Sequence, residues 1–510
     1  MHCFLTKRLN YRPSSAMELL SCLSKKANKK LSSLKACSWR SLCFLFDFFL
    51  FRCDPFFIQI CYFLLTSSFG FLALRILTPN SNAEQGHPRN LDLFFMSVSA
   101  ATVSSMSTVE MESFSPAQHW VLVVLMFIGG EVFTSVLGLH FTNLKLKRES
   151  ESSSSSNSTS IGKSLKFLGH VVFFYILFVN LSGVFLTLLY FSLVADARAV
   201  LRMKKIKVIL FSIFVTVSSF TNCGFTPNNE NMVAFKSNSA LLLILIPQIL
   251  AGNTLFPLCL RLAIWVMKKT TKREEFRDII RRPEVAEYYK HLFPRSHCAY
   301  LALTVAGFVL VQLVLLCQQE WSSPEIFHGM NAFRKLVATL FQSVNSRHAG
   351  ESVFDISKLS PAILVLFVVM MYLPPYTYFI PEERDPPAWN SSNNRRRKLL
   401  LRSLHLSLLC FPVIFVIFIS ITERKSFSID PLNFNIFNVV LEVISAHGNV
   451  GFSMGYSCDR LIRSDGRCED VSYGFAGRWS GKGKMILMVA MLLGRLKKFQ
   501  IEGGKAWNFG

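Results

Sequence analysis

Four short polar turns carry the residues with the most distinctive chemistry in this chain of 510 residues. Each turn follows a short, half-apolar stretch and lies between longer apolar stretches. Irregular backbone is tolerated at membrane depth only where protein or water surrounds it, and glycine accepts the positive φ that turns carbonyl groups toward a common axis. Rings of carbonyl oxygens can replace the hydration shell of a metal cation. Alignment of the turns places Ser105, Gly224, Gly350 and Gly451 in one column.

A glycine in one polar turn is a weak signal, whereas the same position in four successive units is a strong one. The column therefore predicts a selectivity filter, with one residue from each unit. We expect eight neighbours to flank this filter: Ser104, Met106, Cys223, Phe225, Ala349, Glu351, Val450 and Phe452.

Ser105 is the member of the column that is not glycine. A positive φ costs serine about 1 kcal/mol more than glycine, because serine has a Cβ. Either the backbone of the first turn differs from the others or the strain is tolerated, and in both cases the ring of carbonyls loses its symmetry. Because a potassium site needs several carbonyls at matched distances, we expect Ser105 to disfavour potassium and to leave sodium as the main permeant ion.

Acidic residues follow the turns and have two readings of equal weight. They would either attract cations in an outer vestibule or cap and brace the turns. His348 and His447 adjoin two turns, and hydrogen bonding is favoured over proton sensing for both. The acidic residues are Glu110, Glu112, Glu230 and Glu351.

Arg495 lies two-thirds of the way along the last apolar stretch. A charge within a membrane span is costly and usually faces a cavity or a partner, so we expect Arg495 to form an electrostatic barrier below the filter. The alternative is that its side chain extends to the inner interface, as expected for Lys497 and Lys498. Glu131 also lies in an apolar stretch, and the sequence does not identify its basic partner.

The composition indicates a multi-span membrane protein. Apolar residues make up 51% of the chain, 48 residues are Phe, and only 17% are charged, which is low for a soluble chain of this length. The net charge of +23 does not indicate a nucleic-acid partner, because the basic residues lie between apolar spans. No cofactor is expected, and no metal beyond transported sodium or potassium. Cys458 and Cys468 share one loop and would pair if that loop faces an oxidising space.

The apolar stretches predict an all-α polytopic membrane protein with eight transmembrane helices around a central pore of pseudo-fourfold symmetry. Each of four repeats contains a transmembrane helix, a re-entrant pore helix, a filter turn and a second transmembrane helix. The carbonyl end of each pore helix carries partial negative charge, which favours cations. The expected transmembrane helices are 56–77, 117–143, 165–194, 239–266, 298–317, 360–380, 399–422 and 484–501, and the expected pore helices are 91–103, 206–219, 331–344 and 434–445.

The N-terminal tail, the linkers between repeats and the C terminus form the more basic side of the chain, which predicts that they are cytoplasmic. The Ser-rich linker is expected to be flexible, and no cleaved signal peptide is expected. The expected segments are the tail 1–43, repeat one 44–143, the Ser-rich linker 144–164, repeat two 165–266, the basic linker 267–297, repeat three 298–380, the linker 381–398, and repeat four with the C-terminal tail 399–510.

The four turns resemble those of the plant high-affinity potassium transporter (HKT) family, within the wider Trk/Ktr/HKT superfamily. The resemblance covers about residues 45–510 and implies a fourfold pore-hairpin fold and cation transport across the plasma membrane. A serine at the first filter position marks the sodium-selective subfamily, whose members typically withdraw sodium from the xylem and protect shoots from salt, whereas four glycines mark the sodium–potassium cotransporting subfamily. The family arginine of the last span corresponds to Arg495. The motifs lie at 102–112, 222–228, 251–257, 344–351, 446–452 and 493–499.

The leading hypothesis is a sodium-selective transporter that works like a slow channel, in contact with membrane lipid. A sodium–potassium symporter is the main rival, because Ser105 argues against it while the three glycines leave it open. A multi-span enzyme would need clustered catalytic groups or a metal motif such as HExxH, which the sequence lacks. A receptor would need a folded soluble domain, for which the linkers are too short and basic. The bacterial relatives assemble as dimers, which leaves a homodimer open.

Overall fold

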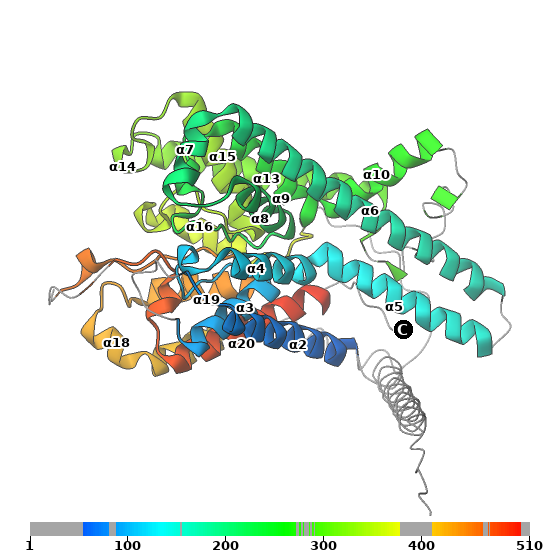
Figure 1. The fold of residues 1–510 in the computed structure, drawn as a ribbon, viewed down its shortest axis with the longest axis horizontal. Coiled ribbons are helices and arrows are strands. Elements are labelled where there is room, and N and C mark those ends of the chain that lie inside the picture. The colour runs from blue at the N-terminus through cyan, green and yellow to red at the C-terminus, as the bar shows by residue number, and fades with distance from the viewer. Residues whose placement is uncertain are drawn as a thin grey trace, which may run out of the picture. The chain divides into compact units, whose positions relative to one another are not determined.

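The computed structural model describes residues 55–80, 88–152, 156–271, 291–377, 411–462 and 470–500, together with 275, 276, 279, 285, 288, 289 and 468. The chain divides into two compact units, residues 1–58 and 59–510. In the first unit, only the beginning of helix α2 is described. The second unit is helical, and its described residues include no strand (Figure 1).

Three helices are long and apolar enough to cross a membrane, judged by length and composition of the described residues. They are α2 (Pro55–Ile76), α6 (Ser156–Leu193) and α13 (Arg295–Glu320). The number rises to five if each of two bent helix pairs forms one span. The first pair is α4 (Pro116–Gly129) with α5 (Glu131–Ser152), bent by 54°, and the second is α9 (Ser239–Gly252) with α10 (Phe256–Thr271), bent by 89°.

The bends correct the prediction that 117–143 and 239–266 are single helices. Gly130 has a ψ of 146° and Asn253 a ψ of −86°, whereas an α-helix needs a ψ near −42°. Each break follows a glycine whose backbone passes close to the end of a short helix. We infer that each helix is interrupted by this close packing against the short helix.

Two further predictions need correction. Helix α16 (Pro361–Tyr372) ends well before the expected residue 380, because Leu373 is extended and is followed by two prolines, which cannot continue a helix. The expected flexible linker 144–164 is helical in its described residues, which belong to α5 and α6. Those two helices pack together and bury Leu146 and Leu165 in one apolar cluster.

Several predictions lie wholly or partly outside the described residues. The tail 1–43 and the linker 381–398 are not described. Of the expected helix 399–422, the structure describes residues 411–422, which form an apolar helix. The last expected helix, 484–501, corresponds to α20 (Gly481–Gln500).

Four short helices match the expected pore helices and pack in a closed cycle with the helices that follow each turn. Each short helix contacts two of these helices, the one that follows it in its own repeat and the one that ends the preceding repeat. α3 (Asn90–Ala101) packs on α4 and α20, α8 (Val208–Thr221) on α9 and α4, α15 (Ala332–His348) on α16 and α9, and α19 (Ile436–Gly448) on α20 and α16.

Side chains tie the start of the second helix of each unit to the end of the first. The donors and acceptors differ from unit to unit, but the placement is the same. Gln118 Nε2 donates to the Leu74 carbonyl at 2.9 Å, Asn238 Nδ2 to Tyr190 Oη at 2.7 Å, the Ser360 amide to Glu320 Oε1 at 2.8 Å, and the Ser480 amide to Glu423 Oε1 at 2.9 Å.

Candidate functional site

All four short helices lead into turns whose backbone enters the left-handed region. Glycine is unstrained there and asparagine is tolerated, whereas a β-branched residue is a rare outlier. Ser105 has a φ of 54°, so the second of the two alternatives, a tolerated strain, is the one observed, and Val103 has a φ of 51°. The first turn therefore holds two strained residues, of which Val103 was not predicted. The left-handed residues of the other turns are Asn222, Gly224, Gly350, Asn449 and Gly451.

The four column residues meet in space, and glycine is required where their backbones touch. A Cβ on Gly224, which has a φ of 90°, would overlap the carbonyl oxygen of Ala349. A Cβ on Gly350, which has a φ of 72°, would overlap the carbonyl oxygen of Val450. Successive turns are thus in backbone contact, and both strain and overlap exclude a larger residue at these two positions.

The contact between the fourth and first turns is different, because a side chain fills it. The space that a Cβ on Gly451 would need is occupied by the Cβ of Ser105, with the carbonyl oxygen of Ser104 beside it. The serine expected to break the symmetry of the column therefore lies against the fourth turn.

In the second, third and fourth turns, side chains of the short helices accept hydrogen bonds from backbone amides. Ser218 Oγ accepts from the Gly224 amide at 3.0 Å, and Ser445 Oγ accepts from the Gly451 amide at 3.0 Å. A cation at the turns would therefore meet carbonyl oxygens rather than these amide donors. In the third turn the acceptor is Asn345 Oδ1, which binds the Glu351 amide at 3.1 Å.

All eight predicted flanking residues are buried. The larger ones pack in the apolar core around the turns. Ser445 Oγ donates to Met106 Sδ at 3.9 Å, and the rings of Phe452 and Phe367 lie 5.4 Å apart. Glu351 is fully buried and accepts a hydrogen bond at 2.6 Å from Ser219 Oγ, which belongs to the second repeat.

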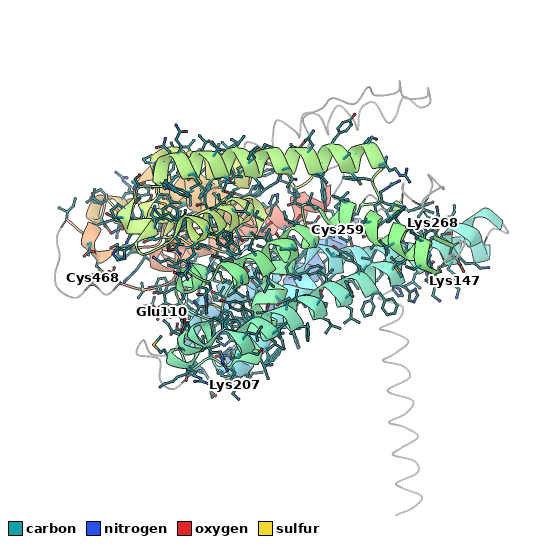
Figure 2. All side chains as sticks on the ribbon, turned by 90° about the horizontal axis from the view of Figure 1, so that it is seen from above. Glu110, Lys147, Lys207, Cys259, Lys268 and Cys468 are labelled. Carbon is teal, nitrogen blue, oxygen red and sulfur yellow. A yellow bond between two sulfur atoms is a disulfide. The ribbon has the colours of Figure 1, made fainter. Side chains whose placement is uncertain are left out.

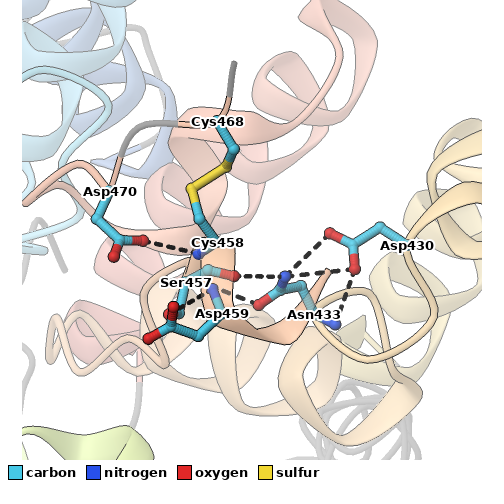
Figure 3. Close-up of a disulfide and its surroundings, with 7 residues drawn as sticks. All are labelled: Asp430, Asn433, Ser457, Cys458, Asp459, Cys468 and Asp470. Carbon is cyan, nitrogen blue, oxygen red and sulfur yellow. Dashed lines mark hydrogen bonds between the residues drawn. A yellow bond between two sulfur atoms is a disulfide. The ribbon is translucent and has the colours of Figure 1, made fainter. Parts of the chain in front are cut away.

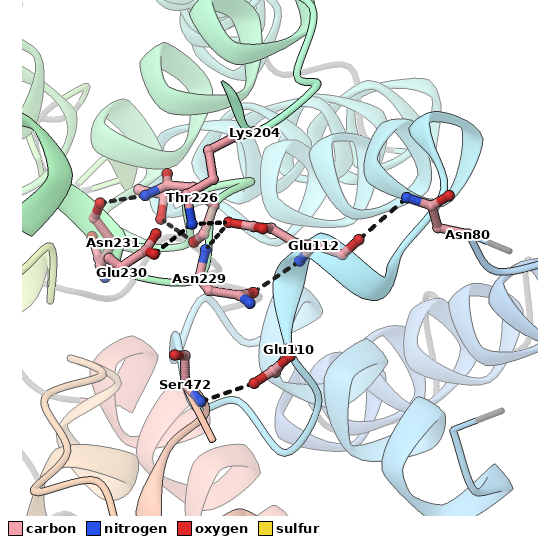
Figure 4. Close-up of polar contacts among 10 residues, drawn as sticks. Asn80, Glu110, Glu112, Lys204, Thr226, Asn229, Glu230, Asn231 and Ser472 are labelled. Carbon is pink, nitrogen blue, oxygen red and sulfur yellow. Dashed lines mark hydrogen bonds and ion pairs between the residues drawn. The ribbon is translucent and has the colours of Figure 1, made fainter. Parts of the chain in front are cut away.

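The acidic residues beyond the turns brace the loops that carry them (Figure 4). Glu112 lies 2.9 Å from Lys204 Nζ and exchanges two hydrogen bonds with Asn229, and Glu230 pairs with the same lysine. Glu110 Oε1 accepts from the Ser472 amide at 3.0 Å. Burial lowers the pKa of Lys204, but the hydrogen bonds and charges of its two carboxylate partners outweigh that effect and leave the pKa raised.

Arg495 is 1% exposed, so its side chain does not extend to the protein surface. Its Nη2 donates to the carbonyl oxygen of Gly129 at 2.5 Å, and its charge interacts with that of Glu131. Glu131 in turn accepts a hydrogen bond from Tyr376 at 3.0 Å. Arg495 and Glu131 therefore attract each other electrostatically, and the hydrogen-bond partner of Glu131 Oε1 is the Tyr376 hydroxyl. His348 and His447 are buried in the last turns of α15 and α19.

Three glycines without a predicted role allow the second helix of a repeat to pack closely against the short helix of the same repeat. A Cβ on any of them would overlap a carbonyl oxygen four residues before the column. Each of these glycines interrupts an apolar run and is followed closely by a polar residue, which is the signal that could have marked them. The pairs are Gly129 with Ala101, Gly252 with Phe220 and Gly494 with His447.

Cys458 and Cys468 form a disulfide, which the sequence left open (Figure 3). Asp470 accepts a hydrogen bond from the Cys458 amide at 2.7 Å and fixes the loop further. Within the compact unit of residues 59–510, Cys468 and Glu110 lie at the opposite end from Lys147 and Lys268 (Figure 2). Among the described residues, no group of three His, Cys, Asp or Glu side chains is placed to hold a metal ion.

Comparison with known proteins identifies the family of the chain. The family model described as "Cation transport protein" (TrkH) matches residues 54–378. The chain is 47% identical to "Cation transporter HKT1;3" of Oryza sativa subsp. japonica, over 94% of this chain and 96% of the relative. It is also 47% identical to "Sodium transporter HKT1" of Arabidopsis thaliana, over 85% of this chain and 91% of the relative.

A solved structure, that of the potassium transporter TrkH from Vibrio parahaemolyticus, is similar at 13% identity with a TM-score of 0.49, covering 87% of this chain and 83% of that chain. The family match and the identities to the plant proteins, in contrast, extend over more than half of the chain. This chain belongs to the HKT family of the TrkH cation transporters, a family of transporters rather than enzymes.

Proposed function

We propose that this protein carries sodium passively across the plasma membrane, through a filter formed by Ser105, Gly224, Gly350 and Gly451. The observation that carries the proposal is the meeting of these residues at the ends of four short helices, with the amide donors of the three glycines occupied and backbone carbonyls at the contacts. The carbonyl ends of the four helices add partial negative charge near the filter. A relative that is 47% identical is named a sodium transporter.

The proposed membrane layout has four repeats and eight transmembrane helices, with both termini in the cytoplasm. The closed packing cycle of short and second helices supports the repeats. Lys147 and Lys268 at one end of the unit support a cytoplasmic face there, and the disulfide at the other end supports an oxidising outer side. Lipid would contact the outward apolar residues of the long helices, such as Phe178 and Leu303. A homodimer is proposed separately, on the family resemblance alone.

Sodium preference is proposed from the first turn. A left-handed Ser105 whose Cβ fills the contact with Gly451 makes the filter asymmetric. A potassium ion needs more carbonyls at matched distance than such a ring offers. The rival is sodium–potassium symport, which the three glycine positions leave open.

Arg495 is proposed as a barrier on the cytoplasmic side of the filter. It is buried, and it binds the Gly129 carbonyl at the α4–α5 break. A fixed positive charge there would raise the energy of a passing cation. The proposed role in the plant is sodium homeostasis and salt tolerance.

Two-electrode recording in oocytes tests the function directly. External sodium and potassium are exchanged at constant ionic strength, and the reversal potential is followed. Sodium-selective transport predicts a reversal potential that tracks sodium alone. A reversal potential that tracks both ions would favour the symporter, and the absence of cation current at a confirmed surface level would contradict both.

A further inference from the structure

One side chain hydrogen-bonds across the contact between the fourth and first filter turns. Asn449 is fully buried and has a left-handed φ of 50°. Its Nδ2 donates to Ser104 Oγ at 2.8 Å and to the Met491 carbonyl on α20 at 3.0 Å. The amide thus joins the first turn, the fourth turn and the helix that carries Arg495.

The bond lies directly beside the asymmetric position of the filter. Ser104 precedes Ser105, and Gly451 lies two residues after Asn449. The Ser104 hydroxyl also lies 2.7 Å from Thr102 Oγ1 of its own turn. It therefore has one partner in the first turn and one, Asn449, in the fourth turn. A change in the Asn449–Ser104 distance would move the Ser105 Cβ relative to Gly451, which it contacts.

The other turn contacts do not have the same pair of residues. Asn222 occupies the equivalent left-handed position in the second turn, but that turn meets Ala349, which has no acceptor side chain. The Asn222 amide instead donates to two carbonyls of its own unit, Ile249 at 3.1 Å and Phe220 at 3.3 Å. At the next contact Gly350 meets Val450, which also lacks an acceptor side chain.

We propose that Asn449 is a positioning residue for ion selection, which sets the spacing of the first and fourth turns through Ser104. The proposal deepens the proposed sodium selectivity and rests on it. Without the bond, the two turns are free to separate and the coordinating site widens toward the size that potassium needs. Because neither side chain has to touch the ion, the effect passes through the position of Ser105.

The test is a double-mutant cycle in the full-length protein expressed in oocytes. Ser104→Ala removes the acceptor, and Asn449→Gly removes the donor while permitting the left-handed backbone. Each single change is expected to raise the potassium-to-sodium permeability ratio about threefold or more. The double variant is expected to match Asn449→Gly, which already removes the bond to Ser104 together with the bond to Met491. Ser104→Thr keeps a hydroxyl and is expected to retain the wild-type ratio.

Asn222→Gly is the matched control, since it removes the same amide from the same backbone conformation without crossing a turn contact. It is expected to leave the permeability ratio unchanged. Unchanged ratios in Ser104→Ala would overturn the proposal even if Asn449→Gly fails to reach the surface, and so would additive effects in the cycle. A wild-type protein whose reversal potential ignores sodium would overturn the proposed function instead, which keeps the two failures distinct.

Discussion

The guanidinium of Arg495 donates a hydrogen bond to the carbonyl oxygen of Gly129, at the break between α4 and α5. The bond joins the last helix of the chain to the first filter unit and fixes a buried positive charge beneath the turns. If that charge is the proposed barrier, Arg495→Ala should raise the maximal inward current at equal surface expression. A barrier lowered by about 1.4 kcal/mol corresponds to a roughly tenfold higher rate.

Lys497 provides the control for this prediction, because it lies on the same helix and stacks 4.9 Å from the ring of Tyr372. Lys497→Ala is expected to leave the maximal current near its wild-type level. Unaltered rate and rectification in Arg495→Ala would show that the arginine has a structural role only.

The filter glycines should tolerate no side chain. Gly224→Ala and Gly350→Ala each place a Cβ on a neighbouring carbonyl oxygen, at a positive φ that costs alanine about 1–2 kcal/mol. Both variants are expected to lose more than nine-tenths of the current per molecule at the surface. Gly307→Ala is the control, since a Cβ at this position in α13 meets nothing within 4 Å. Full current in either filter variant would contradict the assignment of the column.

The buried ion pair between Lys484 and Asp92 should stabilise the packing of α20 on α3. Lys484 Nζ lies 2.6 Å from Asp92 Oδ1, and both side chains are nearly inaccessible. Lys484→Met leaves the carboxylate buried without its partner, and such a change costs about 3–5 kcal/mol. Thermal unfolding in detergent should show a lower midpoint, which Asp92→Asn in the same molecule partly restores. An equal midpoint for the single variant and the wild type would refute this role.

The bridge from Lys204 to Glu112 and Glu230 predicts a specific dependence on alkaline pH. The pKa of Lys204 is raised above its ordinary value of 10.5 by these carboxylates, although burial opposes them. The stability it contributes is therefore fully present below pH 10.5 and is lost as the pH rises through the higher pKa of the folded state. Lys204→Gln should lower the unfolding midpoint by a constant amount from pH 7 to about pH 10 and by less above it.

Lys207 is exposed three residues further along the chain and serves as the control for the pH series. Lys207→Gln is expected to change the midpoint little at any pH in that range. A Lys204→Gln effect that is equally large at pH 12 would show that the lysine acts through packing rather than charge.

The sequence predicted the short helices and the column closely, because both follow from local patterns. A run of 12 to 17 half-apolar residues followed by a short polar turn is visible without the fold, and α3, α8, α15 and α19 have nearly the expected bounds. The breaks at Gly130 and Asn253 were not predictable in this way. They arise where Gly129 and Gly252 pass a carbonyl of another helix, and the polar residue that closely follows each glycine marks the position without predicting that approach.

The side-chain contacts between repeats could not be predicted from the sequence either. The acidic residues Glu110, Glu112 and Glu230 had two equal readings, and only their amide and lysine partners show that they brace the loops. The Asn449–Ser104 bond joins residues 345 positions apart. Strain at Ser105 was one of two outcomes expected where a single residue departs from a fourfold pattern, whereas the strain at Val103 was missed.

The reversal potential of Ser105→Gly tests the central claim most directly. External sodium is replaced by potassium in steps at constant ionic strength, and the wild type and the variant are compared at equal surface level. A filter whose asymmetry comes from Ser105 predicts that the wild-type potential follows sodium, while the variant gains a marked response to potassium. An unchanged potassium-to-sodium permeability ratio in Ser105→Gly would contradict the account.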